Sequence, residues 1–184
     1  MAKVFAFLAT GSEEVENLAV VDVLVRAGIE VKLVSVTGDR EVVTSHNVHI
    51  VTDAVFEEVD CREADVLFIP GGLPGTTNMM AHEGLCAALK EADQSGRRVA
   101  AICAAPSVLG QLGLLEGKQA TCYPGFEDQL KGASYTRTGV VTDGNLTTAR
   151  GLGYALDLGL ELVRLLQGEE KAAKIKAAIQ YDQF

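Results

Sequence analysis

The sequence lacks the clustered basic residues that proteins use to hold a nucleic-acid backbone. Its 16 Lys and Arg residues are scattered among 25 Asp and Glu residues, which gives a formal net charge of -9 at pH 7. Phosphate neutralisation needs grouped Lys and Arg side chains. The charge balance therefore argues against a nucleic acid as the main partner.

Membrane, secretion and metal signals are also missing from the sequence. No apolar run is long enough to cross a bilayer, and no basic leader with a cleavage site precedes the first apolar segment. The four cysteines share no metal-ligand spacing, and the three histidines are scattered. We therefore expect a cytoplasmic protein with no membrane contact, no structural disulfide and no metal.

Short apolar runs alternate with amphipathic stretches, which is typical of successive β-α-β units. With no repeat, linker or low-complexity tract, residues 1–184 are expected to form one domain. Strands are predicted near 4–8, 31–36, 66–69, 98–102, 120–122 and 146–149, and helices near 16–27, 84–94, 106–112, 153–166 and 169–178. A hairpin with Asp-Gly at its turn is expected over 140–146. These elements together predict an α/β protein with a mostly parallel sheet.

Cys103 lies where the apolar run 98–102 ends and a helix begins with Pro106 in its first turn. Unpaired N–H groups and the helix dipole at such a corner favour a thiolate. We therefore expect Cys103 to titrate below an ordinary cysteine. A buried, inert cysteine is the alternative for this position taken alone.

Two other predicted strands end in residues that suit a site. Residues 10–16 follow the first strand, and Pro70, Gly71 and Gly72 follow the third. Open parallel sheets place ligands at such strand ends. Glu13 and Glu14 suit a helix's first turn as dipole partners, whereas Glu16 is expected to project inward. Adjacent glycines allow backbone N–H groups to approach a substrate oxygen.

These motifs resemble one known family. Gly-Ser-Glu-Glu-Val-Glu at 11–16, Pro-Gly-Gly at 70–72, Ala-Ala-Ile-Cys-Ala-Ala-Pro at 100–106 and Arg-Gly-Leu-Gly at 150–153 resemble the ThiJ/PfpI superfamily, in the branch of the parkinsonism-linked protein deglycase (DJ-one-like). The resemblance runs from residue 3 to about 178. It implies a flavodoxin-like three-layer sandwich, a cysteine nucleophile elbow, a homodimer, and catalytic roles for Cys103 and Glu16.

The sequence departs from the pattern of this family at several positions. Tyr123 stands where many members have a His, and Leu152 stands where the nearest members have Pro. His46 replaces an Arg of the dimer and site rim, and Arg26 either lines that rim or is a solvated cation at a helix end. Ala104 follows the cysteine where peptidase members have a His, which argues against proteolysis.

The charges on the two catalytic candidates suggest a reaction that needs no cofactor. An ionised Glu16 would raise the pKa of the Cys103 thiol, whereas a protonated Glu16 could donate a hydrogen bond to the thiolate. The thiolate would attack methylglyoxal, glyoxal or their adducts. Oxyanion or substrate contacts are expected from Gly71, Gly72, Ala104 and Tyr123, at roughly 3 kcal/mol for each oxyanion donor.

Three alternatives remain open for the function. The sequence does not separate glyoxalase from deglycase chemistry on the same aldehydes. A redox sensor or redox-activated chaperone would use the same two residues, with Cys103 oxidised to a sulfinate that Glu16 caps. A catalytically silent binding protein is the third alternative. For the homodimer, we expect apolar contacts from Ala19, Val20, Val23 and Leu24 and from the segment 42–50.

Overall fold

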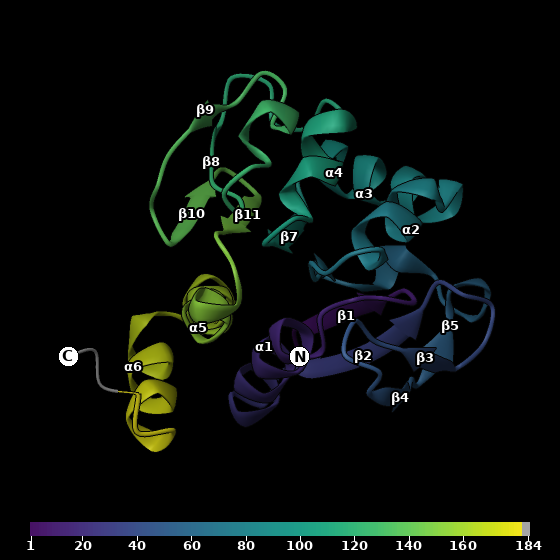
Figure 1. Ribbon diagram of the computed structural model, residues 1–184. Coiled ribbons are helices and arrows are strands. Elements are labelled where there is room, and N and C mark those ends of the chain that lie inside the picture. The colour runs from purple at the N-terminus through teal and green to yellow at the C-terminus, as the bar shows by residue number, and fades with distance from the viewer. Residues whose placement is uncertain (182–184) are drawn as a thin grey trace.

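A seven-stranded sheet forms the centre of residues 1–181, the part of the chain that this computed structural model describes. The strand order is β10-β11-β7-β6-β1-β2-β5, and only the β10–β11 pair is antiparallel (Figure 1). These strands are β1 (Lys3–Leu8), β2 (Glu30–Ser35), β5 (Ala54–Val55), β6 (Val66–Ile69), β7 (Arg98–Ile102), β10 (Val140–Asp143) and β11 (Leu146–Ala149). Two small sheets pair β3 (Glu41–Val43) with β4 (His49–Val51), and β8 (Gln119–Ala120) with β9 (Ser134–Tyr135).

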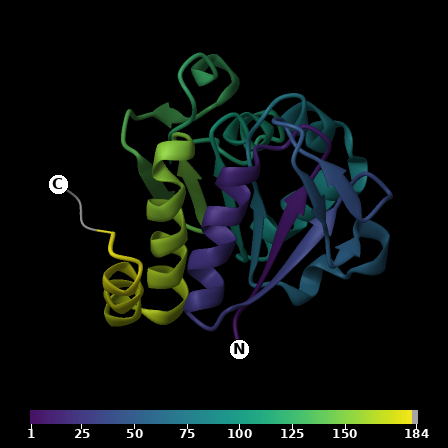
Figure 2. The same ribbon diagram turned by 60° about the horizontal axis from the view of Figure 1, so that its bottom comes forward.

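Helices cover both faces of the central sheet, which gives three layers (Figure 2). The α-helices are α1 (Glu14–Arg26), α2 (Gly75–Ala81), α3 (Glu83–Gln94), α4 (Pro106–Gln111), α5 (Ala155–Gln167) and α6 (Glu169–Ala178). Short 3-10 turns occur at η1 (Phe56–Glu58), η2 (Cys61–Glu63), η3 (Glu127–Gln129) and η4 (Leu152–Tyr154). The flavodoxin-like fold expected from the resemblance is confirmed.

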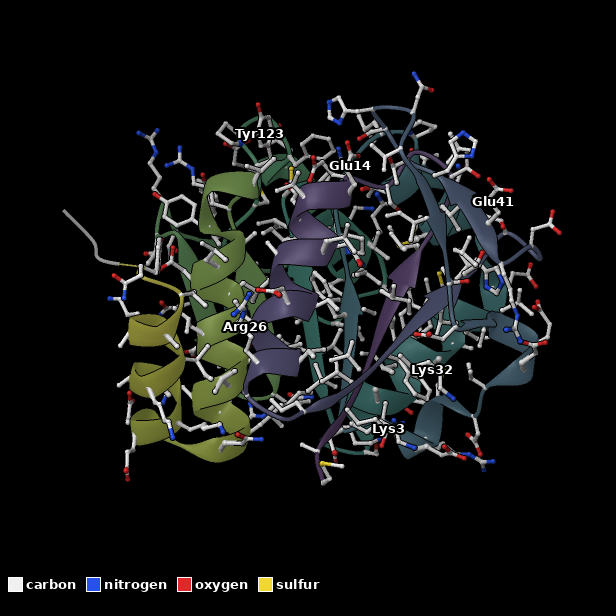
Figure 3. The ribbon with its side chains drawn as sticks, turned by 90° about the horizontal axis from the view of Figure 1, so that it is seen from below. Lys3, Glu14, Arg26, Lys32, Glu41 and Tyr123 are labelled. Carbon is white, nitrogen blue, oxygen red and sulfur yellow. The ribbon has the colours of Figure 1, made fainter. Side chains whose placement is uncertain are left out.

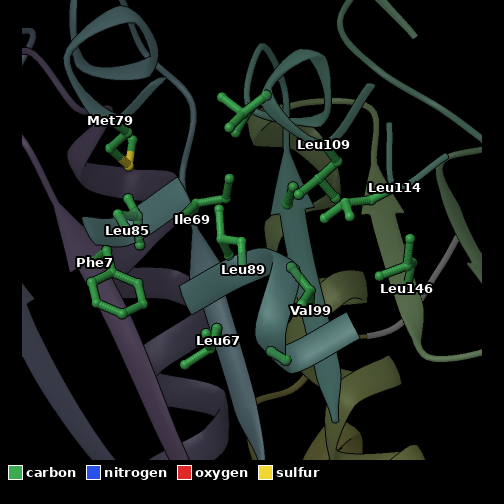
Figure 4. Packing of buried hydrophobic residues seen from close by; sticks show 14 of the residues in the cluster. Phe7, Leu67, Ile69, Met79, Leu85, Leu89, Val99, Leu109, Leu114 and Leu146 are labelled. Atoms are coloured by element: carbon green, nitrogen blue, oxygen red, sulfur yellow. The ribbon is translucent and has the colours of Figure 1, made fainter. Parts of the chain in front are cut away.

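Alternation along the strands divides the core between the two faces. Val4 and Ala6 of β1 face a cluster built with α1, α5 and α6, whereas Phe5 and Phe7 face α2, α3 and α4 (Figure 4). All four side chains are fully buried. Successive side chains of a strand point to opposite faces, so a strand buried on both sides is apolar throughout. The sheet is thereby held rigid between two apolar layers.

Several predicted bounds differ from the observed ones. The strand expected at 120–122 is β8, which ends at Ala120 and pairs with β9 instead of joining the central sheet. The hairpin turn consists of Gly144 and Asn145, one residue later than expected, because Asp143 still pairs with Leu146. The helix expected from residue 153 begins as the 3-10 turn η4, and α5 starts at Ala155.

Three of the four α1 residues expected at a dimer interface belong to the core instead, whereas Ala19 is half-buried. Val20, Val23 and Leu24 are fully buried, because this face of α1 packs against α5. In the hairpin β3–β4, Val42 is also buried and lies against Leu8. Other apolar side chains of the same two segments are exposed within one protomer, namely Val15, Leu18, Val48 and Val51. The homodimer stays a prediction, now with these four residues as its candidate contacts.

Candidate active site

Cys103 occupies the turn between β7 and α4, where its backbone adopts a left-handed conformation with φ of 66°. Its N–H donates to the carbonyl of Ala149 at 2.9 Å, and its own carbonyl accepts from the N–H of Tyr123 at 2.8 Å. A left-handed conformation is disfavoured for a residue with a Cβ, so neighbouring structure must hold it in place. The half-buried side chain is presented at the carboxyl end of the sheet.

Glu16 reaches the same point from the first turn of α1. Glu13 caps this helix, and its Oε2 accepts from the Glu16 N–H at 2.6 Å. The Glu13 N–H donates to the Gly71 carbonyl at 2.9 Å, which joins the loop after β1 to the loop after β6. Glu16 is 1% exposed, and its carboxyl hydrogen-bonds with the Cys103 thiol. The expected pairing of Glu16 with Cys103 is therefore present in the structure.

Gly71 separates the two reactive side chains and leaves no space for a side chain of its own. A Cβ at this position would lie 2.6 Å from Cys103 Cβ and 2.7 Å from Glu16 Oε2. Its N–H donates to Glu16 Oε2 at 2.9 Å. The carboxyl therefore already uses the Gly71 N–H in this structure, and the expected contact of Gly71 with a substrate oxygen stays a prediction.

The Glu16 carboxyl has an unusual affinity for its proton. Burial raises its pKa from the ordinary 4.5 to about 7, and hydrogen bonds from Cys103, Gly71 and the backbone of Leu152 oppose that rise. A buried carboxylate is poorly solvated, so the neutral form gains population. Near neutral pH both protonation states are present, as a group that must give and take a proton requires.

Cys103 does not titrate below an ordinary cysteine, contrary to our expectation. Burial, together with the negative charge of Glu16, raises the pKa of the Cys103 thiol to about 12. Backbone N–H groups of Ala104 and Gly72 hydrogen-bond the sulfur and oppose this rise. The strand-to-helix corner supplies those donors, but burial and the adjacent carboxylate outweigh them. Loss of both protons from the Glu16–Cys103 pair is therefore strongly disfavoured.

The other three cysteines differ from Cys103 in their surroundings. Cys61 and Cys122 are buried, and burial raises their pKa to about 11 and about 12. Cys86 is half-buried on α3, and its Sγ lies 3.2 Å from the Met80 carbonyl oxygen. Only Cys103 among the four has a carboxyl partner at the carboxyl end of the sheet.

Of the two expected rim residues, His46 lies near the first turn of α1 and Arg26 lies elsewhere. His46 Nδ1 is 2.9 Å from Glu14 Oε1 and 3.8 Å from Glu13 Oε1. Arg26 is in the last turn of the same helix, where it pairs with Asp22 at 2.6 Å. Figure 3 shows Glu14 and Tyr123 at one end of the molecule and Arg26 well below them on α1. Within this protomer Arg26 is a solvated cation at a helix end, not a rim residue.

The acidic residues beside His46 have the spacing of a possible metal site. Ligand atoms of Glu13, Glu14 and His46 all lie within 4.8 Å of one another. These groups also bind one another and Ser45, whose Oγ lies 3.3 Å from Glu14 Oε2 and 3.1 Å from His46 Nδ1. Glu13 caps the N-terminus of α1, in agreement with the expected helix-terminal role of this residue.

A cavity of about 260 Å³ opens next to the reactive pair. It is lined by Tyr123, Pro124, Arg150, Gly151, Leu152, Gly153 and Tyr154. Sequence reasoning assigned no function to Arg150 and did not foresee that the Leu152 backbone hydrogen-bonds Glu16. The Arg-Gly-Leu-Gly motif at 150–153 is the sequence feature that could have indicated a role for Arg150 and Leu152 at the site. A larger cavity of about 450 Å³ between β10, α5 and α6 shares no lining residue with this one.

The fold and the site define a flavodoxin-like α/β protein with a cysteine at a strained strand-to-helix corner and a buried glutamic acid against its thiol. Residues 2–165 match the family model described as DJ-1/PfpI family. The chain belongs to the DJ-1/PfpI family.

Individual relatives agree with this assignment. Protein dj-1beta of Drosophila melanogaster is 41% identical over 172 residues, which cover 91% of each chain. The Glutathione-independent glyoxalase DJR-1.2 of Caenorhabditis elegans is 32% identical, with 87% of this chain and 86% of that protein covered. The structure of oxidized Toxoplasma gondii DJ-1 has a TM-score of 0.95 at 35% identity, with both chains fully covered.

Some relatives are much longer than this chain. Protein DJ-1 homolog B of Arabidopsis thaliana is 37% identical over 172 residues, and the match covers 93% of this chain but 39% of that protein. No helix within residues 1–181 is long and apolar enough to span a membrane.

Proposed function

We propose that this protein is a cofactor-independent glyoxalase that converts methylglyoxal and glyoxal to 2-hydroxy acids. The observation that carries the proposal is the buried Glu16 carboxyl, which hydrogen-bonds the Cys103 thiol and has a pKa of about 7. A carboxyl in this state can both accept and return a proton at neutral pH. The relative named as a glutathione-independent glyoxalase supports the same class of reaction.

The nucleophile forms within the pair by transfer of a proton. When Glu16 has ionised and Cys103 is still a thiol, the two groups hold one proton between them. Its transfer from sulfur to carboxylate gives a thiolate beside a neutral carboxylic acid, so the repulsion that opposes thiol ionisation is removed. The high pKa of Cys103 thus describes removal of the second proton, which catalysis does not require.

Attack on the substrate uses the donors that already surround the sulfur. The thiolate adds to the aldehyde carbon and forms a C–S bond, while the carbonyl π pair moves to oxygen. N–H groups of Gly72 and Ala104, which hydrogen-bond the sulfur before the reaction, can then donate to the developing oxyanion. Protonation of that oxygen by Glu16 gives a hemithioacetal and leaves Glu16 as a carboxylate.

Glu16 then moves a proton between two adjacent carbons. The carboxylate takes the C–H proton of the hemithioacetal to give an enediolate, the hydroxyl proton moves to the former ketone oxygen, and Glu16 returns its proton to the neighbouring carbon. The former aldehyde carbon is oxidised to a thioester while the ketone is reduced to an alcohol. Water cleaves the thioester, releases the 2-hydroxy acid and restores the thiol. Methylglyoxal plus water becomes lactic acid, so no external oxidant or cofactor is required.

Deglycase activity is the closest variant of this proposal. A hemiaminal formed from a glyoxal and an amine presents the same two-carbon unit to Cys103. Lactate release from methylglyoxal-treated peptide, compared with release from free methylglyoxal at equal concentration, separates the two activities.

A redox role for Cys103 is the second candidate. The half-buried sulfur, the acidic Glu16 donor and two backbone N–H groups could also stabilise a sulfinate. The similar Toxoplasma gondii structure is named as the oxidized protein. In this role, stoichiometric oxidation of Cys103 by peroxide would change the protein's behaviour without catalytic turnover.

The deciding experiment measures lactate formed from methylglyoxal without glutathione. We expect turnover by the wild type, none by Cys103→Ser, and near-normal turnover by Cys86→Ser, the matched control at a half-buried thiol away from the pair. Absence of wild-type turnover with the thiols fully reduced would contradict the glyoxalase proposal. Peroxide-dependent oxidation confined to Cys103 under those conditions would favour the redox role.

A further inference from the structure

The cavity of about 260 Å³ beside the reactive pair has an apolar wall that is open to solvent. Tyr123 is 51% exposed, Leu152 is 49% exposed and Tyr154 is 37% exposed. Large apolar side chains gathered around a hollow leave surface for a ligand to cover. Contact between each of these side chains and an apolar group in the cavity would remove apolar surface from water and so favour binding.

Backbone hydrogen bonds connect the lining of this cavity to both reactive residues. The Tyr123 N–H donates to the Cys103 carbonyl at 2.8 Å, and the Leu152 N–H hydrogen-bonds the Glu16 carboxyl. The lining of the cavity is therefore joined to the Cys103 backbone and to the Glu16 carboxyl. A substrate bound covalently to Cys103 would use the cavity if its remaining substituent extended from the sulfur toward Tyr123 and Leu152.

Both tyrosine rings lie against glycine backbones. A Cβ on Gly151 would lie 3.3 Å from Tyr123 Cδ2, and a Cβ on Gly139 would collide with the Tyr154 ring. A ring packed against a bare backbone loses little further freedom when a ligand binds. The cavity is in this sense preformed for a flat group.

We propose that this cavity binds the carbon substituent of a 2-oxoaldehyde and selects aryl or similarly large apolar groups over hydrogen and methyl. The inference rests on the proposed glyoxalase function and names its substrate class. An apolar cavity of about 150 Å³ already holds benzene in a well-studied case, so a phenyl group fits in 260 Å³. A methyl group would leave most of the cavity wall in contact with water.

Tyr123 and Tyr154 make an aryl group a better fit than an alkyl group of equal size. Aromatic rings pack on one another in offset-stacked or edge-to-face arrangements, which an aliphatic chain does not offer. Arg150 is the one lining residue with a charged side chain.

The test compares phenylglyoxal with methylglyoxal through the ratio of their kcat/KM values. Each aldehyde has its own intrinsic reactivity, so the informative quantity is the change of this ratio between variants. In Tyr123→Ala the ratio of phenylglyoxal to methylglyoxal should fall at least 10-fold, the scale of an apolar group lost from a binding pocket. Leu152→Ala should lower it in the same direction.

Two further variants show whether the cavity wall is responsible. Tyr123→Phe keeps the ring and should retain the wild-type ratio, which rules out a role of the hydroxyl. Val25→Ala removes an equally exposed apolar side chain from the far end of α1 and should also retain it. An unchanged ratio in Tyr123→Ala, with methylglyoxal still turned over, would overturn the aryl assignment and leave the glyoxalase proposal intact.

Binding of the products gives a readout that does not depend on turnover. Calorimetry should show mandelate, the product from phenylglyoxal, binding at least 10-fold tighter than lactate, with the difference lost in Tyr123→Ala. If neither aldehyde is turned over but this difference is found, the proposed reaction fails and the cavity assignment stands. Equal binding of the two acids by the wild type would overturn the cavity assignment.

Discussion

Replacement of Glu16 by Gln should stabilise the protein at alkaline pH while it removes the proton carrier. Burial raises the pKa of Glu16 from 4.5 to about 7, so the folded protein retains a proton that the unfolded chain has lost between these values. Stability from this group is complete below pH 4.5 and is lost as the pH rises through 7. The difference between the two pKa values corresponds to about 3 kcal/mol.

The amide of Gln carries no charge at any of these pH values, so the variant does not lose stability as the pH rises. Gln has one hydrogen-bond acceptor fewer than the carboxyl, which accepts from the N–H groups of Gly71 and Leu152, and this costs about 1 kcal/mol. We therefore expect Glu16→Gln to be about 2 kcal/mol more stable than the wild type at pH 8.5. Near pH 4 it should be about 1 kcal/mol less stable.

Urea denaturation of both proteins at half-unit steps from pH 4 to 8.5 measures this difference directly. Glu57→Gln, at an exposed glutamate, serves as the control for the loss of one glutamate charge. If the free energy of unfolding of Glu16→Gln relative to the wild type did not change with pH, or fell as the pH rose, a raised pKa of Glu16 would be refuted. The proposed proton transfer would then lose its physical basis.

Four further outcomes are expected. Glu16→Gln should reduce glyoxal turnover about 100-fold or more, the scale of a lost general base, yet leave Cys103 open to alkylation. Glu16→Leu also removes the hydrogen-bonding group and should slow both glyoxal turnover and alkylation of Cys103. Equal behaviour of the two variants would contradict separate roles of Glu16 as proton carrier and as hydrogen-bond partner. Because the pair must lose one proton before attack, kcat/KM for methylglyoxal should rise with pH through about 7, and a flat profile from pH 5 to 9 would argue against Glu16 as the ionising group. Iodoacetamide mapping at neutral pH should label Cys103 first, with half-buried Cys86 as its competitor because Cys61 and Cys122 are buried, and faster labelling of any other cysteine would count against the pair. Light scattering at micromolar concentration should show a dimer, which Leu18→Glu on the exposed face of α1 should dissociate; a monomeric wild type would contradict the expected assembly.

Apolar runs and helix signals were enough to place the long elements. β6 and β7 and helix α6 have the predicted bounds, because each is a continuous apolar strand or a helix that starts just after Gly168. Short elements carried no such signal. β3, β4 and β5 contain two or three residues each, too few to show a period. The sequence of helix α2 (Gly75–Ala81) is typical of a turn, and the helix is stabilised by the burial of Met79.

The composition of the site was easier to predict than its electrostatics. The motif resemblance placed Cys103 and Glu16 together, and the structure shows them in contact. The thiol's raised pKa depends on how deeply the surrounding loops bury it, which no local pattern reveals. The sequence left Arg26 open between the rim and a helix end, and the topology decides: α1 begins at the carboxyl end of β1 and runs back along the sheet, so its last turn lies at the opposite end of the strands.

The left-handed backbone of Cys103 has a consequence for anyone who tries to improve this protein by directed evolution. A residue with a Cβ costs roughly 1–2 kcal/mol in this conformation, and glycine avoids that cost. Glycine at position 103 would relieve this strain at the expense of the packing of the Cys103 side chain and of the nucleophile itself. A screen for heat resistance alone does not detect the lost nucleophile, so selection for stability has to be coupled to selection for turnover at every round.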